Sequence, residues 1–432
     1  MLRYLLCFAI GLSLVGANAQ PYIEGGNTRY RFAQTILGLD FTYTPNTGYS
    51  HFRNAEGQIE RFGWSPQFGT MVDISGIHFW GHVEFNIKIS LTDLKLGNTS
   101  YNDYTFRRLS TSGIKIFPLR LKENRPSPFA AIAIGNMLYR QGEGTELRRT
   151  EYPVSFGVTL PTRYGVLDLG ANFYYNAKHK TYIDRDTKVE FGIPKWNIEF
   201  AYRYAFDITK TQEKQVEAGM IEKRLKFKRE KKRLNDFSLA VGISFSTIVG
   251  RSSYNKEQRP YLDQHRIAPA VVDLGLGYYF HDFDAHLNIA WRQMKTKLKA
   301  YGAAQTITRK ALTFEAYKFL FDYHGFVPFL GIAGSYENLH FLETDNGELV
   351  HDRTRKFWTP GVTFGWDIRP DKDFWIVLRG NLRYFPLLRM GMPGDTKMNI
   401  SQIEFDFIQI TWYPGRMAAA LKVNKEEKLN SK

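Results

Sequence analysis

The sequence predicts an all-β protein, an antiparallel transmembrane β-barrel of about 16 strands. Apolar and polar residues alternate along many segments, as they do in strands with two different faces. These segments run for about 9 to 14 residues, longer than the 5 to 6 usual in soluble sheets and close to the length that crosses a bilayer at a tilt. Short connections also alternate with long polar ones, which is typical of outer-membrane barrels.

The first residues predict export through a cleaved signal peptide. Arg3 precedes an apolar run that ends in Ala-Asn-Ala at 17–19, a pattern that signal peptidase cleaves. We therefore expect a signal peptide at 1–19 and a mature chain that begins at Gln20. The only cysteine of the chain, Cys7, lies in the signal, so disulfides and thiol chemistry are excluded from the mature protein.

Strict alternation is clearest in three segments. Each of the segments 83–91, 196–204 and 374–384 has an apolar face and a polar face. Aromatic residues gather at strand ends, as a girdle at the membrane interface requires. Eight strands are expected in each half of the chain: 33–44, 66–77, 80–92, 106–117, 128–140, 151–161, 165–176 and 189–206, then 237–249, 267–280, 283–296, 306–321, 327–340, 357–368, 374–385 and 400–413.

The two halves are interpreted as an internal duplication. Segments 128–175 and 328–384 share one pattern: a strand, a polar excursion, and two more strands joined by a tight turn. The expected organisation is a first barrel unit at 20–206, a linker at 207–236, a second unit at 237–414 and a polar tail at 415–432. The linker is rich in Glu, Lys and Arg and is expected to be a periplasmic helix, either solvated or lying against the membrane or a partner.

Three stretches carry a resemblance to a known family. They are Pro-Phe-Leu-Gly-Ile-Ala-Gly at 328–334, Pro-Gly-Val-Thr-Phe-Gly-Trp at 360–366 and Leu-Arg-Gly-Asn-Leu-Arg-Tyr at 378–384. On these residues each half resembles the small eight-stranded outer-membrane barrels that include OmpA-, OmpX- and OmpW-like proteins. The resemblance implies a location in the outer membrane of a Gram-negative bacterium. The duplication and the linker depart from that family.

Two architectures are compatible with 16 strands: two plugged eight-stranded barrels, or one sixteen-stranded barrel around an aqueous channel. Two barrels are favoured, because a linker of about thirty residues suits separate bodies better than neighbouring strands. Small residues at inward positions also favour narrow interiors, since they leave room for large charged neighbours. These small residues are Ala131, Ala133, Gly135, Gly275, Gly277, Gly331, Ala333, Ser335 and Gly365.

Charged residues on inward faces are expected to form a structural network, because buried charges must be paired. Arg379 and Arg383 on one strand are expected to face Glu404 and Asp406 on the next. Glu84 and Lys88 are expected to pair in a similar way in the first unit. The alternative role for these six residues is a gate or selectivity cluster.

The sequence contains no phosphate loop, zinc-ligand spacing or nucleophile elbow. No catalytic residue, metal or cofactor is therefore expected. His82 and His286 occupy inward positions, and His340 and His351 flank a loop where a lipid-modifying enzyme would place its base.

The favoured function is a structural or surface-interaction role in the outer membrane, with long extracellular loops as the binding surface. A porin-like channel and, less so, a lipid-modifying enzyme are the alternatives. The net charge of +15 in an exported chain favours outer-membrane lipid and lipopolysaccharide as partners, together with a periplasmic or extracellular protein, and disfavours nucleic acid.

Overall fold

The structure is a computed structural model that describes residues 34–45, 48–53, 56–63, 66–78, 81–92, 94–95, 104–141, 145–175, 177–207, 235–262, 266–320, 326–368 and 375–418. The predicted signal peptide, almost all of the predicted helical linker and most of the tail lie outside these residues. Residues 414–418 form one helical turn after the last strand. No helix in the described ranges is long and apolar enough to cross a membrane.

Eight strands of the first half close into a ring. Each strand pairs antiparallel with the next, and the last pairs with the first through Gln34 opposite Asp207 to Tyr43 opposite Ile198. In ring order they are β1 (Gln34–Thr44), β4 (Gln67–His78), β5 (Val83–Ser90), β7 (Tyr104–Ile116), β8 (Ser127–Gln141), β10 (Pro153–Thr162), β11 (Gly165–Tyr174) and β14 (Trp196–Asp207).

Eight strands of the second half close into a second ring. Its first and last strands pair from Leu239 opposite Trp412 to Ile248 opposite Gln402. The protein therefore contains two closed barrels, as favoured from the sequence, while an origin by duplication stays a prediction. The strands are β15 (Asp236–Ile248), β16 (Arg266–Phe280), β17 (Ala285–Ala300), β18 (Ala303–Phe319), β19 (Phe326–Asp345), β20 (Glu348–Ile368), β21 (Ile376–Phe385) and β24 (Gln402–Trp412).

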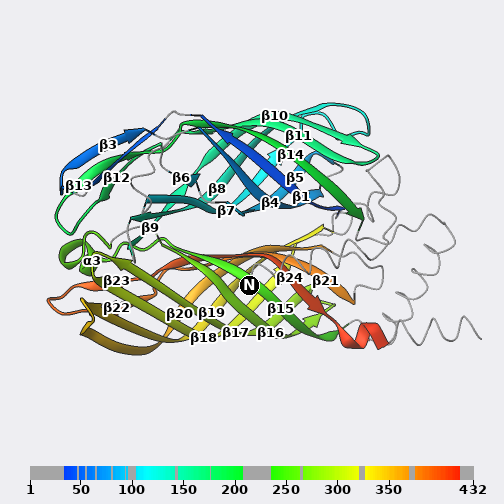
Figure 1. Cartoon of the computed structure of the whole chain (residues 1–432). Helices are drawn as coiled ribbons and strands as arrows, with labels where there is room; N and C mark the ends of the chain where they lie inside the picture. The colour runs from blue at the N-terminus through cyan, green and yellow to red at the C-terminus, as the bar shows by residue number, and fades with distance from the viewer. Residues whose placement is uncertain are drawn as a thin grey trace, which may run out of the picture.

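Each barrel has a turn end and a loop end. At the turn end the connections are mostly short, such as Arg163–Tyr164 between β10 and β11. At the loop end most connections carry further elements, although β17–β18 and β19–β20 are joined by two-residue turns, and Figure 1 shows these further elements gathered on one side of both barrels. They are β2 (Tyr49–Arg53), β3 (Ile59–Gly63), β12 (Lys178–Tyr182) and β13 (Lys188–Gly192) in one small sheet, β6 (Leu94–Lys95) beside β7, β9 (Thr145–Glu151) beside β8, α3 (Ser253–Gln258), and the hairpin of β22 (Arg389–Gly391) and β23 (Lys397–Asn399).

Two expected elements differ from the structure. The expected strand at 189–206 is split into β13 and β14, because Pro194 lies between them and cannot donate to a ladder. The expected strands 327–340 and 357–368 are longer, and they meet in a hairpin where a polar loop was expected. The tip residues Asn346 and Gly347 have φ of 51° and 90°, which suits the two-residue turn that closes it.

The walls are apolar outside and polar inside, the reverse of a soluble barrel. Ile132 is 63% exposed and Ile332 is 69% exposed, whereas Arg203 and Asp273 are fully buried. This distribution is that of a barrel that spans a lipid bilayer. The two barrels lie side by side with their turn ends on the same side (Figure 1). The rings of Phe85 and Trp366 stack between them at 5.5 Å.

Candidate functional site

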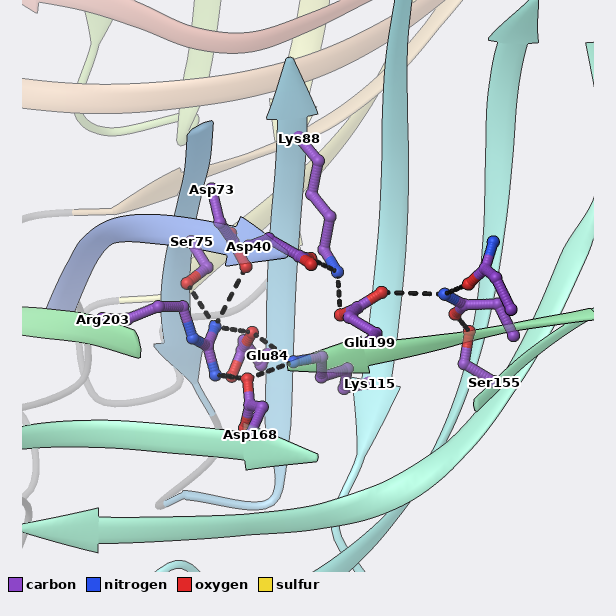
Figure 2. Close-up of polar contacts among 12 residues, drawn as sticks. Asp40, Asp73, Ser75, Glu84, Lys88, Lys115, Ser155, Asp168, Glu199 and Arg203 are labelled. Atoms are coloured by element: carbon purple, nitrogen blue, oxygen red, sulfur yellow. Dashed lines mark hydrogen bonds and ion pairs between the residues drawn. The ribbon is translucent and has the colours of Figure 1, made fainter. Parts of the chain in front are cut away.

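A network of ion pairs fills the middle of the first barrel. The Arg203 guanidinium bonds Glu84 at 2.5 Å and contacts Asp168. The Lys115 ammonium lies 2.8 Å from Asp168 and 3.4 Å from Glu84, so these two cations share two carboxylates. Figure 2 shows them converging from different strands of the wall.

Lys88 forms a second group in the same barrel. Its ammonium bonds both Asp40 and Glu199 (Figure 2). Asn172 donates to Glu199 at 2.8 Å. The expected pair of Glu84 with Lys88 is therefore wrong in its partners. Both side chains lie in the barrel interior, but inward Asn86 separates them along β5. Lys115, one partner of Glu84, lies directly opposite it on the neighbouring β7, whereas Arg203, Asp40 and Glu199 come from more distant strands.

The second barrel holds a larger network built on arginine. Arg309 forms a bidentate contact with Glu337, with both hydrogen bonds at 2.6 Å, and also donates to Glu404. Arg292 lies 2.8 Å from Glu404. Two parallel N–H bonds to one carboxylate fix both groups, so this network holds the wall strands in a single arrangement.

Arg379 and Arg383 lie in this interior, but their partners differ from those expected. Arg379 bonds Asp367 at 2.6 and 3.0 Å, and Arg383 lies 2.8 Å from Asp273 and 2.5 Å from Glu315. Neighbouring strands place Arg383 opposite Glu404 in register, yet the long guanidinium reaches across the lumen instead. Asp406 is fully buried, and within the described residues neither of its oxygens has a hydrogen-bond donor.

Small inward residues make room for these side chains, as the sequence predicted. A Cβ on Gly277 would lie 2.2 Å from the His286 ring, and a Cβ on Gly365 would lie 2.4 Å from the Phe329 ring. The imidazole of His286 therefore packs inside the wall, where its Nε2 lies 2.9 Å from the Ser238 hydroxyl.

Apolar clusters close the turn end of each barrel. In the first barrel, Phe117 and Phe129 meet edge to face at 6.1 Å within a buried cluster. In the second, Arg416 lies 4.1 Å above the Tyr413 ring and 4.8 Å above the Tyr279 ring. The chain after the last strand thus covers the mouth of its own barrel.

The loop end of the second barrel is closed by its own loops. Tyr254 of α3 and Met390 of the β22–β23 hairpin belong to a buried cluster that fills the mouth. Asn255 and Gln305 exchange two side-chain hydrogen bonds of 3.1 and 2.9 Å, which fix α3 to the wall. The described part of this barrel therefore has no open route along its axis.

The loop end of the first barrel is covered by the second barrel. Met137 and Tyr174, which are inward residues of the first wall, share one buried cluster with Leu298 and Ala303 of the β17–β18 hairpin and with Leu262. We call this cluster the shared core. It joins the loop ends of the two barrels through buried apolar contacts.

Polar contacts surround the shared core, and we call them the clasp. Arg185, from the turn between β12 and β13, bonds both carboxylate oxygens of Asp345 and donates to the Tyr301 carbonyl at 2.9 Å. Arg259 lies 3.2 Å from Asp345 and 2.8 Å from Glu343. The hydrogen bond from Arg185 lowers the pKa of Asp345 below its usual range.

The space left in the first barrel is small. A cavity of about 40 Å³ is lined by Lys88, Arg108, Tyr174 and Glu199 among others. This volume holds a few water molecules, since one water needs roughly 10 to 15 Å³ measured in this way.

Within the described residues, the histidines that the sequence singled out contact carboxylate, carbonyl and aromatic groups. His340 Nε2 lies 2.8 Å from an Asp352 oxygen on the outer face, and His351 lies with its ring 5.6 Å from that of Tyr254. His82 Nδ1 lies 2.9 Å from the Phe117 carbonyl. No group of His, Cys, Asp and Glu in the described part of the chain is arranged to hold a metal ion.

These features define a class of protein: a transmembrane β-barrel protein with two closed, plugged barrels. No protein-family model matches the sequence, and no curated protein matches it significantly.

Several solved outer-membrane structures are similar at low identity. Neisserial surface protein A is 15% identical and covers 41% of this chain and 96% of its own, with a TM-score of 0.30. Ail, the attachment invasion locus protein of Yersinia pestis, is 12% identical over 41% of this chain and 97% of its own, with a TM-score of 0.27. The toluene transporter TodX of Pseudomonas putida is 11% identical over 92% and 95%, with a TM-score of 0.20.

Proposed function

We propose that this is an integral outer-membrane protein that binds a partner at the joined loop ends of its two barrels and conducts no solute. The observation that carries the proposal is the filling of both interiors together with the shared core. A channel needs a continuous aqueous path, but ion-pair networks and apolar clusters occupy both barrels. The rigid, filled barrels therefore serve to hold the loop-end surface in place for binding.

The small sheet of β2, β3, β12 and β13 supplies a firm part of that surface. The guanidinium of Arg61 stacks 3.9 Å above the Tyr49 ring, and Lys178 forms an ion pair of 3.2 Å with Glu190. Tyrosine and arginine side chains are enriched among the residues that carry the binding energy of protein interfaces. An extracellular or envelope protein with an acidic surface is the partner that this chemistry suits.

A catalytic role has less support. An enzyme acting on lipid at the outer rim would need a hydroxyl nucleophile activated by a histidine. His340 Nε2 lies 2.8 Å from Asp352, and within the described residues no hydrogen bond joins His340 to a serine or threonine hydroxyl. We therefore propose a non-enzymatic role.

Site-specific labelling tests the proposed location and orientation. Because the only cysteine of the sequence is Cys7, in the predicted signal, single cysteines are informative. Lys188→Cys, on the loop-end sheet, is expected to react with a membrane-impermeant maleimide on intact cells, whereas Phe283→Cys, at the turn end, is expected to react only after lysis. The reverse pattern, or absence of the protein from outer-membrane fractions, would overturn the proposal.

A loop-end variant tests the binding role. Arg61→Glu with Lys178→Glu reverses the charge of the sheet and is expected to abolish the added adhesion of expressing cells to a surface coated with an acidic protein. Lys122→Glu with Lys318→Glu, both exposed at the turn end, reverses the same amount of charge and should adhere like the wild type. Equal adhesion of expressing and non-expressing cells would count against the role.

A further inference from the structure

The outer face of the second barrel has a sharp boundary between apolar and basic residues. Strand pairing places Trp291, Leu312, Tyr336 and Trp358 side by side in one row across β17 to β20. All four are at least 40% exposed. Trp358 lies 5.5 Å from Tyr336, measured between ring centroids. Aromatic side chains in such a row mark the level at which a membrane meets water.

Lysines begin immediately beyond this row. The next row towards the loop end contains Lys310 and Lys356, and the following rows add Lys295 and Lys297 on the outer face of β17. All four are exposed, and we call them the lysine band. Their positions alternate with inward residues, so their side chains share the face that carries Trp291.

The lysine band is not neutralised by nearby acids. Among the described residues no carboxylate forms an ion pair with any of the four lysines, and Asp352, the acid on the same outer face, contacts His340. The acids of neighbouring strands, such as Glu315 and Glu337, point into the barrel, where arginines hold them. The outer face at this level is therefore strongly positive.

We propose that the lysine band binds the phosphate groups of lipopolysaccharide in the outer leaflet. The proposal rests on the proposed outer-membrane location, which puts the loop end and hence this level at the outer leaflet. A lysine stem can lie along the acyl chains while its ammonium reaches the headgroup level. Four ammonium groups spread over β17, β18 and β20 match a ligand that carries more than one phosphate, whereas an ordinary phospholipid carries one.

The closing experiment measures retention of lipid A by the purified full-length protein in detergent, using native mass spectrometry. The band variant combines Lys295→Gln, Lys297→Gln, Lys310→Gln and Lys356→Gln. The control variant removes the same charge from exposed lysines away from the membrane level: Lys180→Gln, Lys188→Gln, Lys256→Gln and Lys397→Gln. The probes are lipid A with two phosphates, its dephosphorylated form and phosphatidylglycerol.

The wild type and the control variant are expected to retain the phosphorylated lipid A, and the band variant to retain it about tenfold less, since four exposed charge contacts are each worth a few tenths of a kcal/mol. The dephosphorylated form should bind all three proteins equally weakly. Equal retention by band and control variants would overturn the proposal, as would phosphatidylglycerol binding that depends equally on the band.

Failure of the lysine band and failure of the proposed function give different results. A band variant that is found in the outer membrane and labelled at its loop end, yet binds phosphorylated lipid A like the wild type, would overturn the lysine band alone. Absence of the wild type from the outer membrane would instead overturn the proposed function.

Discussion

Arg383 shows how single residues hold the second barrel together. Its guanidinium lies 2.8 Å from Asp273 and 2.5 Å from Glu315, and all three side chains are buried. Charges taken out of water are costly, and only close, well-oriented partners offset that cost. The network therefore favours one arrangement of the strands and disfavours others.

Replacing Arg383 by methionine is expected to lower the free energy of unfolding by about 3 to 5 kcal/mol, because two buried carboxylates lose their main cation. Urea unfolding in lipid vesicles measures the change. Lys256→Met, at an exposed position of α3, is the control and should change stability by less than about 0.5 kcal/mol. Equal stability of both variants with the wild type would show that the network does not hold the barrel.

The sequence identified residues of the interior better than it identified their partners. Alternation marks Arg379, Arg383, Glu404 and Asp406 as inward, and all four are buried. Partners were expected on the same strand or on β24, whereas Arg379 pairs with Asp367 of β20, on its other side and directly opposite in register. Other long side chains reach strands several places away in the narrow lumen, as Lys88 does in bonding Asp40 and Glu199.

At the scale of elements, the β17–β18 hairpin and the turn between β12 and β13 join the two barrels. Neither contact had a signal in the sequence. Alternation predicts which face of a strand is inward, but the inward face of β17 near Leu298 packs against the other barrel. The split of the strand at Pro194 was readable from the sequence, because proline interrupts a ladder.

The Asp345 carboxylate of the clasp predicts how the stability of the protein depends on pH. The pKa of Asp345 is lowered by the hydrogen bond from Arg185, so the folded state binds fewer protons than the unfolded state near the unfolded pKa of about 3.9. Its contribution is present above that pH and is lost as the pH falls through the lower folded pKa. Asp345→Asn should therefore lower the unfolding temperature by a constant amount between about pH 5 and 8. The difference should shrink below about pH 4, and a difference that instead changes near pH 6 to 7 would contradict the assignment.

The role of the shared core as a cover is tested by how fast a water-soluble reagent reaches the interior of the first barrel. Ser155→Cys places a thiol in the wall beside the small cavity of the first barrel. In the otherwise wild-type protein it is expected to react slowly with a water-soluble thiol reagent. Adding Leu298→Ala, which removes about 2 to 5 kcal/mol of packing from a buried site, should speed the reaction several-fold. Leu349→Ala on the exposed β20 is the control and should leave the rate unchanged.

At the scale of the whole molecule, each ring of strand pairs is complete within its own half. A half of a single large barrel would have two open edges and could not fold in a membrane, because unpaired backbone groups are costly there. Residues 235–432 behind a signal peptide are therefore expected to give a folded product whose mobility in electrophoresis shifts on heating. Residues 1–207 should do so less well, because the shared core covers their loop end in the full chain.

Single-channel recording of the purified full-length protein in planar bilayers tests the central claim most directly. Two plugged barrels predict no steady openings, because ion pairs and apolar clusters fill both interiors. Steady openings of the size seen with porins would contradict two separate plugged barrels.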